Sequence, residues 1–217
     1  MTLAQAVSAP ELVLTVEEIA AVEHAIVPTL RFRLRVDAGG REVRSLALNV
    51  QVRIDATRRS YEAGDEERLL ELFGPRERWG QTLRSLLWTQ AAATVPLFAG
   101  ETHVELLVPA TYDFEVVAAK YLNALAGGDV PLELLFSGTL FFQGPDGRLQ
   151  AAPISWELEA RAALPVAVWR EAIDVAFPGS AWLRLQREAF DRLWSYRAER
   201  ALPSWEATLD DLLDGRD

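Results

Sequence analysis

Carboxylates are the residue type in this sequence that could do acid–base chemistry. Glu66, Glu67 and Glu71 lie in one acidic stretch, and Asp210 and Asp211 are adjacent near the C-terminus. A hydrolase could use two such groups as general acid and general base. Acids on a helix surface are usually solvated, and the first set stands where the positive end of a helix favours negative charge. A carboxylate-dependent hydrolase is therefore the least favoured of the functions considered.

Other reactive residue types are scarce. The two histidines, His24 and His103, have no accompanying nucleophile motif such as GxSxG. There is no cysteine, which excludes disulfides, thiolate catalysis, iron–sulfur ligation and zinc–thiolate sites. The glycine pairs at 39–40 and 127–128 lack phosphate-binding spacing and are interpreted as turns. No EF-hand spacing is present. We therefore predict no catalytic residue, no metal ligand and no cofactor.

Arginines gather on one face of two predicted strands. Residues 29–36 alternate apolar side chains with Arg31, Arg33 and Arg35, and Arg53 follows in the next strand. One interpretation is a solvated sheet face, or one covered by an acidic helix of the protein itself. The other is a docking face for an acidic protein surface, with a salt-sensitive rate of association. The first is favoured, and both stay open.

Seven tryptophans are many for this length, and each lies in an apolar pattern that favours the core. Tryptophan is also enriched at the centres of protein interfaces. For Trp182 and Trp205 the two interpretations are balanced, because both lie on helical segments with much apolar surface. The candidate partner-binding residues are Trp182, Trp205, Leu209, Leu212, Leu213, Arg31, Arg33 and Arg35.

The segment after Pro203 is predicted to be a detachable docking helix. Ser204 can cap it, and Glu206 suits its positive end. From Trp205 onward, apolar residues recur at i, i+4, i+7 and i+8 and form one stripe. A helix of about ten residues is too short to be stable alone in water. The stripe must pack either on the protein's own body or in a groove of a partner.

The clearest strand pattern that could position these residues is Val130 to Leu164. Gly-Pro-Asp-Gly-Arg at 144–148 favours a hairpin with a three-residue loop. In the register that this turn sets, Phe136 faces Trp156 on an apolar face. Trp156→Ala would then cost about 3–5 kcal/mol. Four polar residues would point the other way: Ser155, Glu157, Glu159 and Arg161.

A second hairpin is predicted from residues 29–36 and 43–56, joined by a loop that contains Gly39-Gly40. Both segments alternate apolar and polar residues. Matching their apolar faces places Phe32 opposite Leu48. This hairpin would have one apolar face and one arginine-rich face.

Further elements follow from the same patterns. Asp65 would cap the first helix. Residues 112–126 fit a helical stripe that ends at Gly127-Gly128, with a strand as the alternative. Helices are predicted over residues 65–73, 77–87, 112–126, 166–177 and 181–200, the last capped by Ser180, and over a short segment after Ser204. Strands are predicted at residues 11–16, 88–98 and 102–108.

The order of elements is mostly strands and then mostly helices. That order favours an α+β fold, with an antiparallel β-sandwich-like core and a C-terminal helical cap. We expect residues 1–164 to form a mainly antiparallel β core with inserted helices. Residues 165–217 would form the helical cap, packed on the same core, so that the chain is a single domain overall.

Charge and hydropathy restrict the partners. The formal charge of −10 argues against nucleic acid or an anionic membrane as a partner of the whole surface. No apolar run is long enough to cross a bilayer, and the first residues have no basic and then apolar stretch typical of a secretory signal. We therefore predict a cytoplasmic protein without membrane insertion.

Five segments carry a resemblance to a known family. They are RWGQTLRSLLWTQ (78–90), TYDFEVVAAKYLNAL (111–125), PLELLFSGTLFF (131–142), LPVAVWRE (164–171) and FPGSAWLRLQREAFDRL (177–193). Together they resemble a domain-of-unknown-function family of bacterial, mostly actinobacterial, proteins, over most of the chain. The resemblance implies a gene position beside nickel–iron hydrogenase structural and maturation genes. The resemblance identifies no catalytic residue in this sequence.

The resemblance and the residues together favour a non-catalytic accessory or assembly protein that binds a partner protein. The resemblance implies that this partner is a hydrogenase subunit or maturation factor. Without cysteine the chain cannot supply thiolate ligands to a cluster or a nickel–iron centre. The alternative is a small-molecule binding module with a Trp-lined cavity. A co-purifying ligand would select this alternative, and a stoichiometric protein partner would select the first. The sequence does not indicate the oligomeric state.

Overall fold

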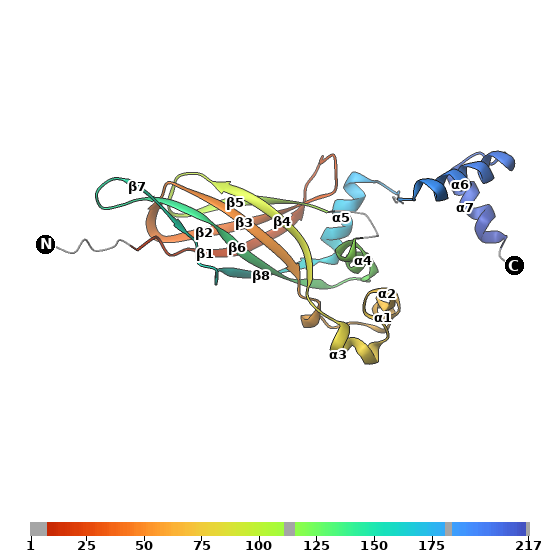
Figure 1. Ribbon diagram of the computed structural model, residues 1–217, viewed down its shortest axis with the longest axis horizontal. Coiled ribbons are helices and arrows are strands. Elements are labelled where there is room, and N and C mark those ends of the chain that lie inside the picture. The colour runs from red at the N-terminus through yellow and green to blue at the C-terminus, as the bar shows by residue number, and fades with distance from the viewer. Residues whose placement is uncertain (1–7, 111–115, 181–183, 216–217) are drawn as a thin grey trace. The chain divides into compact units, whose positions relative to one another are not determined.

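The computed structural model describes residues 8–110, 116–180 and 184–215 (Figure 1). The chain divides into two compact units, Met1–Ala181 and Trp182–Asp217. Within the described residues, all strands and the first five α-helices belong to the first unit, and two helices belong to the second. The packing of the C-terminal helices on the β core stays a prediction.

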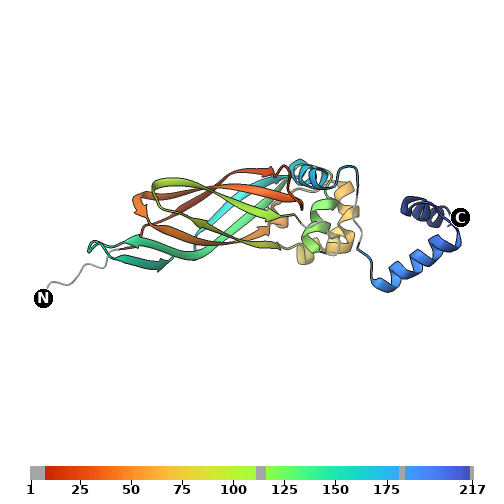
Figure 2. The same ribbon diagram turned by 90° about the horizontal axis from the view of Figure 1, so that it is seen from above.

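The first unit is built on two antiparallel sheets (Figure 2). The three-stranded sheet has the order β1-β2-β5, and its strands are β1 (Val13–Ala21), β2 (Thr29–Val43) and β5 (Phe98–Pro109). The five-stranded sheet has the order β4-β3-β6, and both β7 and β8 pair with β6. Its strands are β3 (Ser45–Ile54), β4 (Leu86–Val95), β6 (Asp129–Gln143), β7 (Leu149–Pro153) and β8 (Glu159–Pro165).

The two sheets pack face to face around one hydrophobic core. Strict alternation in β2 and β3 turns every second side chain inward, because successive residues of a strand point to opposite faces. The buried residues of these two strands include Leu30, Phe32, Leu34, Val36, Leu46, Leu48, Val50, Val52 and Ile54. The predicted α+β fold with an antiparallel, sandwich-like core and C-terminal helices is confirmed.

The second predicted hairpin is wrong. Strands β2 and β3 do not pair but lie in opposite sheets, so Phe32 does not face Leu48 across a ladder. The chain changes sheets at Arg44, and the two apolar faces meet across the core. Gly39 and Gly40 lie within β2 at positive φ, where its pairing with β5 is irregular. Likewise β4 and β5 lie in opposite sheets, and the break between them is at residues 96–97, whereas the strands predicted at 88–98 and 102–108 placed it at 99–101.

The predicted hairpin at 144–148 is confirmed, but its register holds only near the turn. Thr139 pairs with Pro153 and Phe141 with Ala151, as the turn predicts. Beyond that point the register is shifted by two residues, so that Leu134 pairs with Ala160 instead of Leu158. A slip of two residues keeps every side chain on its own face, and the alternation therefore cannot reveal it.

A tight turn causes this shift. The Leu158 N–H donates to the Ser155 carbonyl at 3.2 Å, and the Ser155 hydroxyl accepts from the Glu157 N–H at 3.2 Å. The turn loops Trp156 out of the ladder, where it is 86% exposed. The predicted burial of Trp156 opposite Phe136 is therefore wrong.

Trp156→Ala is now expected to lower the free energy of unfolding by less than about 1 kcal/mol, because an exposed side chain loses little packing. Chemical denaturation would measure the change. Phe136→Ala is the control, since Phe136 is buried and should cost about 3–5 kcal/mol. A loss above about 2 kcal/mol for Trp156→Ala would show that the tryptophan packs on the protein.

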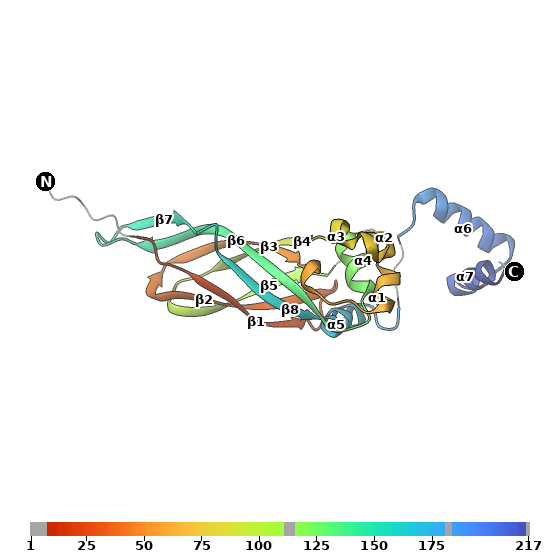
Figure 3. The same cartoon turned by 90° about the horizontal axis from the view of Figure 1, so that it is seen from below.

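The helices of the first unit gather at one end of the sandwich, opposite the β6–β7 turn (Figure 3). They are α1 (Ala63–Arg68), α2 (Leu70–Phe73), α3 (Trp79–Thr82), α4 (Val117–Ala124) and α5 (Val166–Ala176), with short 3-10 turns at Ala56–Arg58 and Arg76–Arg78. Helices were predicted in these places, and α4 settles the choice for 112–126 in favour of helix where the structure describes it. Residues 111–115 lie outside the described residues.

Three predicted helices have different bounds. The helix predicted at 65–73 is two short helices, and Glu62 rather than Asp65 stands at the N-cap position of α1. Only Trp79–Thr82 is α-helical in the region predicted as 77–87. In the second unit, α6 covers Arg187–Glu199, so the helix does not run from Ser180 as predicted.

The second unit consists of α6 and α7 (Trp205–Asp214). Ser204 caps α7 as predicted. No helix of the described residues is long and apolar enough to cross a membrane.

Candidate protein-binding surface

The helices α6 and α7 are joined by a cluster of three aromatic rings. The ring centroids of Phe190 and Trp194 on α6 lie 5.6 and 5.8 Å from that of Trp205 on α7. The Arg197 guanidinium stands 4.7 Å from the centroid of the Trp205 ring, a cation–π contact. The same guanidinium donates to the carbonyls of Leu202 and Pro203 and so holds the connecting segment. Trp205 therefore serves first as the contact between the two helices.

Local hydrogen bonds begin α7. The Ser204 hydroxyl accepts from the Ala207 N–H at 3.1 Å, and the Thr208 hydroxyl donates to the Ser204 carbonyl at 2.8 Å. Hydrogen bonds from its own N–H and from Ser204 lower the pKa of Glu206. An ionised Glu206 suits the positive end of the helix dipole.

Asp211 forms a polar link between the same two helices. The Tyr196 hydroxyl donates to an Asp211 carboxylate oxygen at 2.5 Å, and Arg200 pairs with that carboxylate at 3.0 Å. The hydrogen bond to Asp211 raises the pKa of Tyr196. Asp211 is thus a structural partner, and its neighbour Asp210 is exposed.

Most apolar residues of this unit remain exposed. No described residue of α6 is buried, and Thr208 is the buried residue of α7. A hollow of about 690 Å³ is lined in part by Ala189, Leu193 and Leu212. We use the name apolar face for the exposed large apolar residues of the unit: Leu185, Trp194, Leu209, Leu212 and Leu213. Trp182 lies outside the described residues.

The arginine face of β2 has acidic partners on its own sheet. Arg31 pairs with Glu105 at 3.7 Å and Arg35 with Glu101 at 3.2 Å, both on β5. Arg33 pairs with Glu17 on β1 at 3.7 Å. These pairs reduce the positive charge that an acidic partner would meet, which weakens the docking interpretation of this face.

The candidate carboxylates and histidines do not converge. Glu66 pairs with Arg76 at 3.0 Å, Glu71 bonds to Lys120, and His103 contacts Glu17 at 3.0 Å. Among the described residues, no group of three or more His, Cys, Asp or Glu side chains is placed to hold a metal ion.

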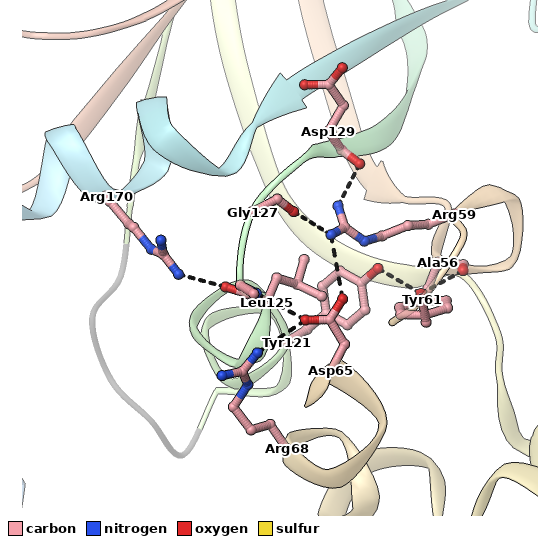
Figure 4. Close-up of polar contacts among 11 residues, drawn as sticks. Ala56, Arg59, Tyr61, Asp65, Arg68, Tyr121, Leu125, Gly127, Asp129 and Arg170 are labelled. Carbon is pink, nitrogen blue, oxygen red and sulfur yellow. Dashed lines mark hydrogen bonds and ion pairs between the residues drawn. The ribbon is translucent and has the colours of Figure 1, made fainter. Parts of the chain in front are cut away.

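The sequence did not reveal a buried polar network at the helical end of the sandwich (Figure 4). The side chains of Arg59 and Asp65 are 7% and 3% exposed and lie 3.7 Å apart. Arg59 also donates to the carbonyls of Gly127 and Asp129, and Asp65 accepts from the Ala126 N–H at 2.9 Å. The network ties α1 to the segment that leads into β6.

Two tyrosines extend this network. The Tyr61 hydroxyl donates to the Ala56 carbonyl at 2.6 Å and lies 2.7 Å from the Tyr121 hydroxyl. Because the Tyr61 hydroxyl already donates its proton to the Ala56 carbonyl, the Tyr121 hydroxyl donates to the Tyr61 oxygen. Burial raises the pKa of both phenols. The adjacent hollow of about 510 Å³ carries both Arg59 and several acids, which suits a structural network better than a charged ligand.

The tryptophans divide between core and surface. Trp79 and Trp169 are buried, and Trp88 packs against Trp169 at a centroid distance of 6.0 Å. Trp156 and Trp194 are exposed. The two hollows of about 690 and 510 Å³ have no tryptophan in their linings. A Trp-lined ligand cavity therefore gains no support from them.

The chain belongs to the family of unknown function DUF6084, which matches residues 9–217. This agrees with the predicted membership of a domain-of-unknown-function family. A comparison with curated proteins found no match.

Among solved structures, the chain is similar to a protein of the late embryogenesis abundant (LEA) type, with 14% identity over 72% of this chain and 71% of that one, and a TM-score of 0.31. It is also similar to beta-glucosidase 3B from Thermotoga neapolitana, with 12% identity over 71% of this chain and a TM-score of 0.26. A beta-glucosidase from Kluyveromyces marxianus matches at 10% identity over 73% of this chain, with a TM-score of 0.24. The matches cover 17% and 15% of the two glucosidases. At these scores the likenesses carry no argument about function.

Proposed function

We propose that this protein is a non-catalytic accessory or assembly protein that binds a partner protein through the apolar face of α6 and α7. One observation carries the proposal. The unit Trp182–Asp217 exposes Trp194, Leu209, Leu212 and Leu213 on its described helices and Leu185 just before α6, and it buries no apolar side chain of α6 or α7.

A helical hairpin of this size has too little core to be stable through its own contacts. Chains below about 40 residues usually need a disulfide, a metal or a partner to fold. Cysteine is absent from the sequence, so a disulfide is excluded. The aromatic cluster and the Asp211 links fix the two helices against each other. Through its apolar face the hairpin can then bind an apolar groove or another helix, a common mode of recognition between proteins.

The identity of the partner rests on the resemblance of the sequence. The resemblance points to bacterial, mostly actinobacterial, proteins encoded beside nickel–iron hydrogenase genes. We therefore propose a hydrogenase subunit or maturation factor as the partner and a cytoplasmic location, which fractionation of the source cells would test.

A matched pair of substitutions tests the proposal. Leu213 on α7 and Leu149 on β7 are 64% and 66% exposed. Leu213→Asp places a charge on the apolar face and should reduce capture of the purified hydrogenase proteins at least about tenfold, since a buried unpaired charge is costly. Leu149→Asp should leave capture unchanged. Pull-down with quantitative mass spectrometry measures both.

The same pair distinguishes a partner from the protein's own body. If the apolar face packs on the first unit, Leu213→Asp should lower the Tm by about 5 °C or more, and Leu149→Asp should not. Equal capture by both variants, or a fall in Tm confined to Leu213→Asp without loss of capture, would contradict the proposed function.

A further inference from the structure

The edge strand β4 of the five-stranded sheet lacks the charges and prolines that keep sheet edges apart. Among the described residues β4 pairs only with β3, so its other side presents unpaired backbone N–H and C=O groups. Such an edge is a template for pairing with another chain. The ten residues of β4, LLWTQAAATV, contain no charged residue and no proline.

The other edge strands carry the usual protection. Natural proteins place charges, prolines, bulges or very short strands at edges to prevent pairing. Strand β1 has a break in register between Val16 and Glu18, and β7 is five residues long. The protecting residues of these edges are Glu17 and Glu18 in β1, Glu101, His103 and Glu105 in β5, Pro153 in β7, and Glu159, Arg161 and Pro165 in β8.

Most of β4 is regular enough to receive a strand. Its irregularity falls at Trp88, near its start, and Thr89 to Val95 follow β3 residue by residue. The outward side chains of this stretch are those of Gln90, Ala92 and Thr94, which are exposed. The side chains of Ala92 and Thr94 are short and allow another strand to approach closely.

The charges around the β4 edge indicate which molecule can pair with it. The residues of β3 beside Gln90, Ala92 and Thr94 are Gln51, Asn49 and Ala47. This outer patch is uncharged, although a quarter of the chain is charged and its formal charge is −10. Two copies of such an acidic protein repel each other over most of their surfaces. They can meet at this patch without bringing like charges together.

We propose that β4 pairs antiparallel with β4 of a second copy, so that the five-stranded sheets of two molecules join across a two-fold axis. An antiparallel pair of identical strands is self-complementary, as a two-fold interface requires. The inference is independent of the proposed function, because it uses the first unit and not the apolar face.

A measurement of the oligomeric state tests this inference. Sedimentation of the full chain should show a dimer within roughly 1–100 µM. Ala92→Lys places like charges near the axis and should weaken the dimer at least about tenfold. Ala163→Lys is the matched control, because Ala163 is an exposed alanine on β8, an edge of the same sheet. It should leave the dimer unchanged, and Tm values close to wild type would show that both variants fold.

The absence of cysteine allows a second measurement. Ala92→Cys gives a molecule with one thiol, and oxidation should link two copies through it, while Ala163→Cys should stay monomeric in a non-reducing gel. A monomeric wild type over the whole concentration range overturns the inference. A dimer that Ala92→Lys does not weaken would also overturn the inference. A dimer that is lost with Leu213→Asp but not with Ala92→Lys would do the same. Pairing of β4 with a strand of a different protein would appear as a monomer in both measurements and would overturn it too.

Discussion

Replacing Gly138 with alanine is expected to destabilise the first unit by about 3–6 kcal/mol, the sum of backbone strain and overpacking. Gly138 lies in the middle of β6, opposite Leu48 of β3. Its φ of 155° is rarely adopted by residues with a side chain. An added Cβ would lie 2.0 Å from the Ala47 carbonyl oxygen. That oxygen belongs to the backbone of the central strand and cannot move aside without disturbing the sheet.

Thermal denaturation would measure this effect, with an expected fall in Tm of about 10 °C or more for a unit of this size. Gly80→Ala is the control, because an added Cβ there meets no atom within 4 Å and φ is not in the left-handed region. It should leave the Tm unchanged or raise it slightly, since alanine lowers the entropy of the unfolded chain. A Tm of Gly138→Ala within 2 °C of the Tm of Gly80→Ala would show that the strands do not approach so closely at this point.

Gly138 also shows how far the sequence could predict the sheets. A glycine inside an apolar strand pattern often marks a close approach of another backbone, so this position carried a usable signal. Alternation correctly predicted which side chains of β2 and β3 turn inward. It could not predict which strands pair, because a period of two residues defines a face and not a neighbour. The second hairpin failed for this reason.

The candidate surface was predictable where local interactions determine it. The Ser204 cap depends on residues within one turn and matches the prediction, and α7 has 10 residues, close to the predicted length. The contact of Trp205 with Phe190 and Trp194 depends on the path of the connection between helices, which the sequence does not specify. The acidic partners of Arg31, Arg33 and Arg35 required knowledge that β1 and β5 flank β2.

Asp65 was the least predictable of the important residues. Its sequence position, in an acidic stretch before an apolar run, is typical of an exposed N-cap. In the structure it is buried, and one of its partners, the Ala126 N–H, stands 61 residues away, while Arg59 reaches it from the segment before α1. No local pattern predicts the hydrogen bond to a residue as remote as Ala126.

Asp65→Asn is expected to cost about 3–5 kcal/mol at neutral pH, because it leaves the buried Arg59 guanidinium without its counter-charge. The amide oxygen of asparagine can still accept from the Ala126 N–H, so this hydrogen bond is kept while the negative charge beside Arg59 is lost. Asp210→Asn makes the same substitution at an exposed site and should change the free energy of unfolding by less than about 0.5 kcal/mol. Urea denaturation of the three proteins at pH 7 compares them directly. Equal stability of both variants would mean that Arg59 does not depend on Asp65.

The effect of Asp65→Asn should also depend on pH. Burial raises the pKa of Asp65, but the hydrogen bonds from Ala126 and Arg68, with the charge of Arg59, outweigh it and hold the pKa below its ordinary value. A carboxyl whose pKa is lowered on folding stabilises the fold above its unfolded pKa of about 4, and this stability is lost as the pH falls through the folded pKa. The difference between wild type and Asp65→Asn should therefore be largest near neutral pH and shrink below about pH 4, where the carboxyl of unfolded wild type begins to bind a proton while that of the folded protein is still ionised. A difference that stays constant from pH 7 to pH 3 would attribute the cost to altered packing instead of the buried charge pair.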